Sequence, residues 1–209
     1  MRKVTIIILL FLTGALVPAT VMSQQTEIEW LQNINHSAPG LKPLSVVLTE
    51  TTIPINLAIP GGMGLYALFS GNNDLMKEAL GIAFASGINW GLTIALKNSF
   101  RRERPDITYP GMLDIYEVRS DFAMPSGHTS SAFSTATSLT LRYPEWYVAV
   151  PAYVWATSVG FSRMHLGVHY PTDILAGAVL GAGSAWLSWK LNQWFWSQYD
   201  LRGVKIKRK

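Results

Sequence analysis

Cationic and histidine side chains gather in three short polar stretches of an otherwise apolar sequence. The 209-residue chain is 49% hydrophobic and only 14% charged. The three stretches are residues 97–105, 123–129 and 163–173. In them Lys97, Arg104 and Arg163 supply positive charge, and each arginine can make paired contacts with the oxygens of an anion. Transfer of a phosphoryl group needs this charge stabilisation together with a nucleophile and a proton donor, so the residue types suit phosphoryl chemistry.

The second stretch reads as the start of a helix that faces an anion. Pro125, Ser126 and Gly127 precede a run with helical character. The backbone N–H groups from Ser126 to His128 are therefore expected to point at the anion, and Gly127 would let the chain approach it closely. The sequence predicts a phosphate cradle at this turn.

Each of these residues also has an ordinary structural explanation. Lys97 can snorkel from a helix end to the lipid headgroups, His128 can cap a helix, and Asp173 can favour the first turn of one. Arg101 and Arg102 are interpreted as loop charges in contact with solvent, Arg102 in particular. The set taken together is what indicates a site.

A metal centre is the competing interpretation of the third stretch. His165, His169 and Asp173 stand four residues apart and would share one face of a continuous helix. Gly167 and Pro171 interrupt that helix, and a proline disfavours helical geometry at the residue before it. We therefore expect neither a metal nor a cofactor, and we interpret His165 as a bystander or a substrate contact.

The motifs in these stretches resemble those of the type 2 phosphatidic acid phosphatase superfamily. The family includes membrane lipid phosphatases, soluble bacterial acid phosphatases and vanadium-dependent haloperoxidases. Its three signatures appear as Lys97-x6-Arg104-Pro105, Pro125-Ser126-Gly127-His128 and Ser162-Arg163-x5-His169-x3-Asp173. The resemblance covers residues 75–195, and residues 24–74 carry none of it.

The resemblance implies a role for each residue of the motifs. His169 would attack phosphorus, and His128 would protonate the departing oxygen and later deprotonate the attacking water. Asp173 would accept a hydrogen bond from the ring nitrogen of His169 that does not attack. The residues that would bind the phosphate are Lys97, Arg104, Ser126, Gly127 and Arg163.

Long stretches without Asp, Glu, Lys or Arg surround these motifs. They are residues 51–73, 80–96, 122–141, 146–162 and 174–189. Each approaches the roughly 20 residues that cross a bilayer as a helix. The Ser and Thr content of residues 122–141 favours a soluble bundle instead, but the other four stretches favour a membrane. We therefore predict an all-α, polytopic membrane helix bundle with five or six transmembrane helices, counting an N-terminal signal or anchor.

The two ends of the chain differ in composition from the rest. Residues 1–23 have the basic start, apolar run and small residues of a signal peptide, or they form a first transmembrane helix. Residues 24–200 are expected to form one membrane phosphatase domain, and residues 201–209 a basic cytoplasmic tail. Before the tail comes an aromatic cluster typical of a membrane interface: Trp186, Trp189, Trp194 and Trp196. The absence of cysteine excludes disulfides and thiolate chemistry.

Alternating the apolar stretches across a membrane brings the three polar stretches to one surface. If the chain emerges outside the cytoplasm after residue 23, the tail lies inside, in agreement with the positive-inside rule. We expect a multi-pass protein of a bacterial inner membrane whose site faces the periplasm or exterior. The basic residues then serve the membrane flank and the site, and no nucleic-acid partner is expected.

The expected activity is hydrolysis of a lipid phosphate or pyrophosphate monoester, without a metal, through a phosphohistidine. The family resemblance implies a phospholipid, an isoprenoid pyrophosphate or a lipid A-type substrate. Three alternatives remain: a phosphotransferase with an acceptor other than water, a vanadate-using haloperoxidase, and a silent binder of anionic headgroups. A haloperoxidase is expected to be larger and soluble, and a silent binder needs no nucleophile with an orienting carboxylate.

Overall fold

The computed structural model describes residues 24–199 and 201, and it places these in helices and loops without a strand. The predicted signal or first helix at residues 1–23 lies outside the described residues, as does the basic tail after residue 201. The helices are α2 (Gln24–His36), η2 (Pro39–Leu41), α3 (Lys42–Glu50), α4 (Thr52–Ser70), α5 (Asn73–Phe100), α6 (Pro105–Thr108), α7 (Gly127–Arg142), α8 (Trp146–His165) and α9 (Pro171–Trp196). The all-α prediction is confirmed.

Each of the five charge-free stretches forms a helix, with shifted boundaries. Helix α5 begins earlier than predicted because the side chain of Asn72 caps it, accepting the Leu75 N–H at 3.0 Å. Helix α7 begins at Gly127, five residues later than the predicted start of that stretch at residue 122. The residues before it are not helical because their N–H groups bond elsewhere: Ala123 donates to the carbonyl of Arg102, and Ser126 donates to that of Asp173. These two bonds tie the loop to the rest of the site.

Helix α7 lies at the centre of the bundle, packed against α5, α8 and α9. Its small polar residues are buried by protein, among them Ser130, Ser134 and Thr135. Ala132 and Ala136 meet Ala156 and Val159 of α8 in an apolar cluster. The Ser and Thr content that favoured a soluble bundle thus reflects contact with neighbouring helices, where short side chains allow close packing.

Two glycines let α9 approach α7 closely. A Cβ atom at Gly181 would lie 2.0 Å from the carbonyl oxygen of Ser130, and one at Gly177 would lie 2.7 Å from that of Ser126. Both are backbone atoms that cannot move aside. Any larger residue at these positions would push α9, and the Asp173 that it carries, away from α7.

The outer surface of the bundle is apolar. Three helical stretches are long and apolar enough to cross a membrane: Pro39–Ser70, Asn73–Thr108 and Pro171–Trp196. Large side chains on α4 point outward, with Leu57 69% and Phe69 90% exposed. An exposed surface of this kind is suited to a hydrocarbon environment.

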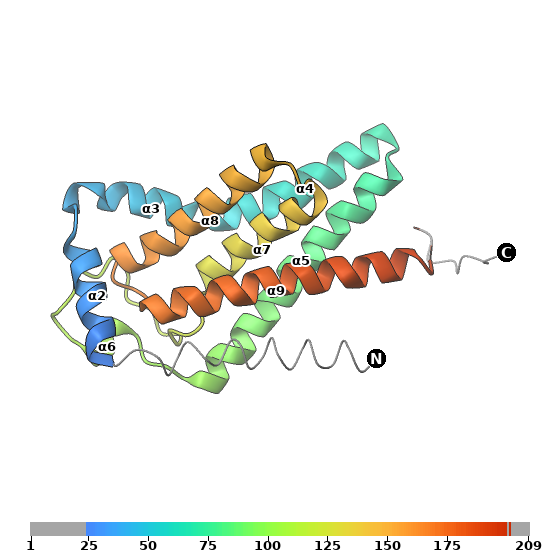
Figure 1. Cartoon of the computed structure of the whole chain (residues 1–209). Helices are drawn as coiled ribbons and strands as arrows, with labels where there is room; N and C mark the ends of the chain where they lie inside the picture. Colours follow the sequence, from blue (N-terminus) through green and yellow to red (C-terminus); the bar gives the residue numbers. More distant parts are fainter. Residues whose placement is uncertain (1–23, 200, 202–209) are drawn as a thin grey trace.

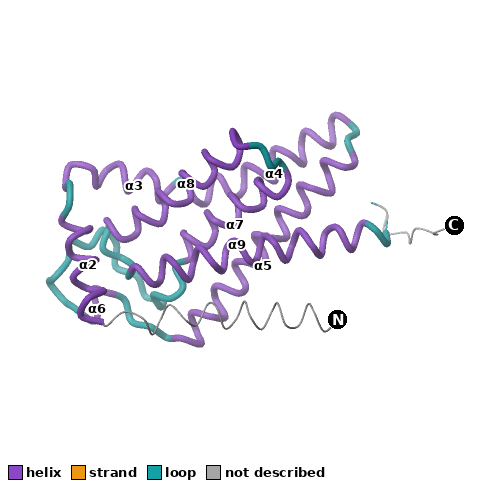
Figure 2. Tube along the Cα trace, in the orientation of Figure 1, coloured by secondary structure: helices purple, strands orange, loops and turns teal. Residues whose placement is uncertain are grey.

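The longest loop, between α6 and α7, lies at the same end of the bundle as α2 and the turn between α8 and α9 (Figures 1 and 2). Asn35 of α2 holds this end together: its side chain donates to the carbonyls of Asp114 and His165 and accepts the Asp114 N–H at 2.8 Å. Tyr116 adds a backbone bond to Leu166. Residues 24–50, which carry no motif, thus brace the end of the molecule where the motifs meet.

Candidate active site

The first motif supplies two cations that share one carboxylate. Arg104, at the start of α6, is 2% exposed, and Lys97, in the last turn of α5, is 8% exposed. The Asp121 carboxylate lies 2.6 Å from Nη2 of Arg104 and 2.9 Å from Nζ of Lys97. Partial burial alone would raise the pKa of Asp121, but Lys97 and Arg104 hold that pKa below its ordinary value. An ionised carboxylate therefore already occupies one side of these cations.

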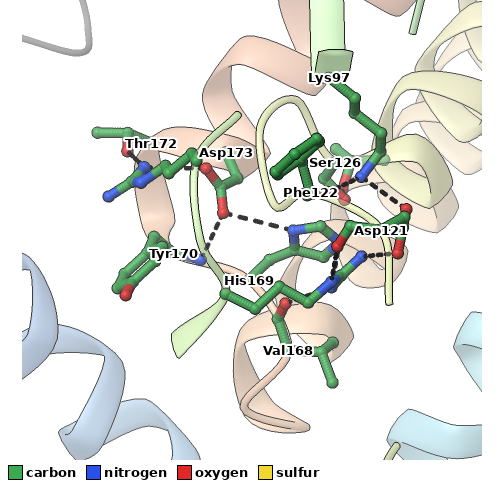
Figure 3. Close-up of polar contacts among 12 residues, drawn as sticks. Lys97, Asp121, Phe122, Ser126, Val168, His169, Tyr170, Thr172 and Asp173 are labelled. Carbon is green, nitrogen blue, oxygen red and sulfur yellow. Dashed lines mark hydrogen bonds and ion pairs between the residues drawn. The ribbon is translucent and has the colours of Figure 1, made fainter. Parts of the chain in front are cut away.

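The turn after α8 presents His169 to the same cations. Arg104 donates from Nη1 to the carbonyl of Val168 at 2.7 Å, and this nitrogen lies 3.4 Å from Nε2 of His169. On the other side of the ring, Nδ1 lies 3.4 Å from Oδ2 of Asp173, which also accepts the Tyr170 N–H at 2.9 Å. Figure 3 shows the His169 ring between Asp173 and Asp121. One ring nitrogen thus faces a carboxylate, and the other faces the cations.

The surroundings of His169 keep the ring neutral. Burial lowers its pKa well below the ordinary value, and the charges of Arg104 and Arg163 lower it further. A neutral imidazole has a lone pair on one nitrogen, and a proton on Nδ1 facing Asp173 leaves that pair on Nε2. The arrangement is that of a nucleophile with an orienting carboxylate.

Arg163, near the end of α8, is buried with unused hydrogen-bonding capacity. It is 1% exposed, and its Nη1 donates to the hydroxyl of Thr49 at 2.8 Å. Its Nε and Nη2 are buried and have no partner among the described residues. Buried donors are almost always satisfied, so two unpaired ones on a single cation indicate the place of an anion.

The second motif contributes less of its backbone than predicted. The N–H of Ser126 was expected to point at the anion, but it donates to the carbonyl of Asp173 at 3.0 Å. The Ser126 hydroxyl accepts from Thr129 at 2.9 Å, and the residue is fully buried. The N–H groups of Gly127 and His128, at the start of α7, have no acceptor within the helix and are the donors that this turn offers.

His128 opens onto a cavity of about 240 Å³ between α4, α5 and α7. Charged and polar residues also line it, including Lys97, Asp121 and Ser131. Its outer wall carries apolar side chains that are 40–69% exposed: Ile53, Trp90 and Ile94. The cavity joins the motif residues to the apolar surface.

The interpretation of Arg102 as a solvated loop charge is wrong. Its Nη1 lies 2.9 Å from Oδ1 of Asp173, its Nη2 is paired with Glu27 of α2, and its guanidinium lies 4.0 Å above the ring of Tyr170. Arg102 therefore holds the carboxylate that faces His169. Arg101 is exposed, as expected of a loop charge.

His165 takes no part in the site. Its Nδ1 bonds to the hydroxyl of Ser45 and its Nε2 to the carbonyl of Ser37, both at 2.7 Å. Both ring nitrogens are thus occupied by structural partners, which favours the interpretation of His165 as a bystander. Within residues 24–199, no group of three His, Asp or Glu residues is placed to hold a metal ion.

Some residues around the site lie outside the motifs. Asp121 has no motif to mark it, and Glu27 and Thr49 lie in the N-terminal region without family resemblance. In the sequence, the one sign of such partners was the presence of acidic residues that could pair with the cations of the motifs. No spacing rule indicates which of them pair.

Comparisons with known proteins agree with the motifs. The family model described as "PAP2 superfamily" matches residues 78–197. A lipid A 4'-phosphatase of Bacteroides thetaiotaomicron is 29% identical over 111 residues, which are 52% of this chain and 49% of that protein. A putative undecaprenyl-diphosphatase of Escherichia coli is 24% identical over 157 residues, 74% of this chain and 76% of that one. The chain thus spans about half the length of the first of these relatives.

A solved structure has the same fold. The first transmembrane PAP2 type phosphatidylglycerolphosphate phosphatase from Bacillus subtilis superimposes with a TM-score of 0.66 at 24% identity, over 92% of this chain and 97% of that one. The likeness shows the fold. The three helices that are long and apolar enough to cross a bilayer support a multi-pass membrane protein. Because the family model matches more than half of its residues, the chain belongs to the PAP2 superfamily.

Proposed function

We propose that this protein is a metal-independent phosphatase that hydrolyses a lipid phosphate or pyrophosphate through a phosphohistidine on His169. The observation that carries the proposal is the pair of unpaired, buried nitrogens on Arg163, at the same end of the bundle as the neutral His169. A phosphoryl group bound by Lys97, Arg104 and Arg163 would satisfy those donors and present phosphorus to Nε2 of His169.

The first chemical step joins phosphorus to Nε2 of His169. As the bond forms, positive charge develops on the ring, and Asp173 stabilises it through Nδ1–H. The bond from phosphorus to the lipid oxygen breaks, and His128 gives that oxygen a proton. The position of His128 on the cavity wall supports this role, because the cavity connects His128 with the apolar surface through which a lipid leaving group can depart.

Water completes the reaction. With its proton gone, His128 takes one from a water molecule that attacks the phosphohistidine, and inorganic phosphate leaves. An acceptor other than water in this step would make the protein a phosphotransferase. The Asp121 carboxylate must share Lys97 and Arg104 with the incoming phosphate, so bound phosphate and this carboxylate compete for the same cations.

We assign the site to the outer face of a bacterial inner membrane and residues 24–200 to one membrane phosphatase domain. The exposed Ile53, Trp90 and Ile94 support entry of the lipid from the bilayer. Substrates are a phospholipid, an isoprenoid pyrophosphate or a lipid A-type molecule, in keeping with the names of the relatives.

Val118→Cys and Val204→Cys test the sidedness in intact cells, because the chain has no cysteine of its own. An impermeant thiol reagent should label the first variant and spare the second, and the reverse pattern would move the substrate to the inner leaflet.

Release of inorganic phosphate from a panel of lipid phosphates tests the activity. Purified protein in detergent should release phosphate in the presence of excess EDTA, because side-chain cations neutralise the substrate, and vanadate should inhibit as an analogue of the transition state. Addition of alcohol acceptors separates hydrolysis from transfer. Loss of activity in EDTA with recovery in magnesium, or binding of lipid without phosphate release, would contradict the proposal.

A further inference from the structure

Arg119 adds to the site a cation that belongs to none of the three motifs. It lies in the loop between α6 and α7 and lines the same cavity as Lys97, Asp121 and His128. Arg104, Arg163 and His169 are not among the residues that line this cavity. Arg119 therefore lies on the side of the site where His128 stands.

The loop holds Arg119 in a fixed place. Two residues after it, Asp121 is tied to Lys97 and Arg104, and three residues before it, the Tyr116 N–H donates to the carbonyl of Leu166 at 3.2 Å. Ala123 is bonded to the Arg102 carbonyl. These contacts anchor the loop on both sides of Arg119.

The guanidinium of Arg119 is available to a ligand. Its Nε pairs with Glu117 at 2.8 Å, and within residues 24–199 no other hydrogen bond of this guanidinium is formed. The two side chains are 33% and 42% exposed, so solvent weakens their attraction. The remaining acids whose charges act on Arg119 are Asp121, already engaged by two cations, and Glu50. Two Nη groups thus remain free to bind oxygen atoms of a second anion.

The cavity beside His128 has room for a phosphoryl group on the leaving side. Its volume of about 240 Å³ corresponds to roughly eight water molecules. The phosphoryl group under attack would be held by Lys97, Arg104 and Arg163. Because Arg119 shares the cavity with His128, it lies on the side to which the leaving oxygen departs. If the leaving group were a neutral alcohol, the substrate would offer no anionic partner to Arg119.

We propose that Arg119 binds a second phosphate joined to the scissile one through the leaving oxygen, so that the enzyme favours lipid diphosphates over lipid monophosphates. This inference rests on the proposed function and names its substrate class. The relatives named above include both a diphosphatase and a lipid A phosphatase, so the comparisons alone do not decide between the classes.

The reaction balances with water as the only co-reactant. Nε2 of His169 bonds to the terminal phosphorus, and the bond from that phosphorus to the bridging oxygen breaks. The electron pair stays on the bridging oxygen, which becomes part of a lipid monophosphate, and Arg119 neutralises its charge while His128 supplies the proton. Hydrolysis of the phosphohistidine consumes one water and releases inorganic phosphate.

The test compares an alkyl diphosphate with the alkyl monophosphate of the same chain length, by initial rates of phosphate release from detergent-solubilised protein. The unaltered protein should show the higher kcat/KM with the diphosphate. Arg119→Gln should lower kcat/KM for the diphosphate by about 10- to 100-fold, the range for a lost charge-assisted contact, and for the monophosphate by less than about threefold. Arg119→Lys should restore part of the preference.

Two further variants guard against a structural explanation. Arg101→Gln removes the same charge from an exposed residue near the site and should leave the ratio of the two kcat/KM values unchanged. Glu117→Gln frees Arg119 from its partner and should increase the preference for the diphosphate. Equal losses with both substrates in Arg119→Gln, or an unchanged preference in that variant, would overturn the inference while leaving the proposed function intact. Failure of the unaltered protein to hydrolyse either substrate would contradict the proposed function, and this inference with it.

Discussion

Two buried histidines, four residues apart, flank the turn between α8 and α9, and their surroundings give them opposite capacities. Both are 2% exposed. Both ring nitrogens of His165 have hydrogen-bond partners at 2.7 Å, Ser45 and Ser37. Those of His169 have looser neighbours, Asp173 and Arg104, each at 3.4 Å. The ring with two short hydrogen bonds braces the fold. The ring with two long contacts holds its Nε2 less tightly, and we propose that this nitrogen reacts.

The arginines show the same contrast. Arg102 directs its charge to Glu27 and Asp173, whereas two nitrogens of Arg163 have no partner among the described residues. Residue type does not separate these two arginines. They differ in whether the protein itself has used the hydrogen-bonding capacity of the side chain.

Substitution of each histidine is the most direct test of the difference between His165 and His169. His169→Asn should lower turnover by at least about 10⁴-fold, because it removes the attacking atom. His165→Asn should keep turnover within about tenfold and lower the free energy of unfolding by about 1–3 kcal/mol, because a buried partner of Ser45 or Ser37 is lost. Phosphate release and thermal unfolding in detergent measure the two effects. A fully active His169→Asn protein, or an inactive but stable His165→Asn protein, would reverse the assignment.

Loss of the proton donor should affect substrates differently, according to how readily their leaving group departs without a proton. His128→Ala should lower turnover of an alkyl phosphate by about 10²- to 10⁴-fold, since an alkoxide leaves poorly without a proton. An activated aryl phosphate leaves as an anion and should lose less in its first step. Single-turnover release of alcohol and of phenol measures that step. An equal loss with both substrates would mean that His128 is not the acid.

Removal of an unsatisfied cation should affect substrate binding and rate together. Arg163→Gln should lower kcat/KM by about 10²- to 10³-fold, because donors directed at the anion are lost in a site shielded from water. The matched variant Arg102→Gln acts only through Asp173 and Glu27, so it should lower kcat and stability with little change in KM. If Arg102→Gln instead raised KM as much as Arg163→Gln, the distinction between satisfied and unsatisfied arginines would fail.

Replacement of the internal carboxylate should produce the smallest effect, in the opposite direction. Asp121→Asn removes the anion that shares Lys97 and Arg104, so inorganic phosphate should inhibit about 3- to 30-fold more strongly. The inhibition constant for phosphate measures this change. Weaker inhibition in the variant would mean that Asp121 positions the two cations rather than competing with the ligand.

Much of the fold could be predicted from the sequence, because charge-free stretches of membrane length leave a clear pattern. Helices α4, α5, α7, α8 and α9 lie where the five stretches were expected. The pattern did not reveal that α7 is enclosed by other helices, which explains its Ser and Thr content, nor that α2 and α3 pack against α8. Residues 24–50 are polar and short-helical, so neither membrane length nor a motif marked them.

The sequence indicated which residues could form a site, and their catalytic and binding roles stay predictions, but it did not indicate how these residues are connected. The structure brings the predicted residues of all three motifs to one end of the bundle. It also pairs Ser126 N–H with Asp173 and Arg102 with Glu27, which no spacing indicated. Motif spacing depends on residues close together in the sequence, whereas hydrogen-bond partners depend on how distant segments pack. Thr49 and Asp121 were missed for the same reason.

Trapping of the covalent intermediate tests the central claim that His169 attacks phosphorus and His128 serves the leaving oxygen and the water. The measurement uses an activated aryl phosphate labelled in its phosphoryl group, because its first step depends less on His128, with rapid quenching and denaturation of the protein. His128→Ala lacks the base for the second step, so it should accumulate label that is labile in acid and stable in base, as phosphohistidine is. His169→Ala should carry no label with any substrate. Label on His169→Ala would contradict the account, because another residue would then be the nucleophile.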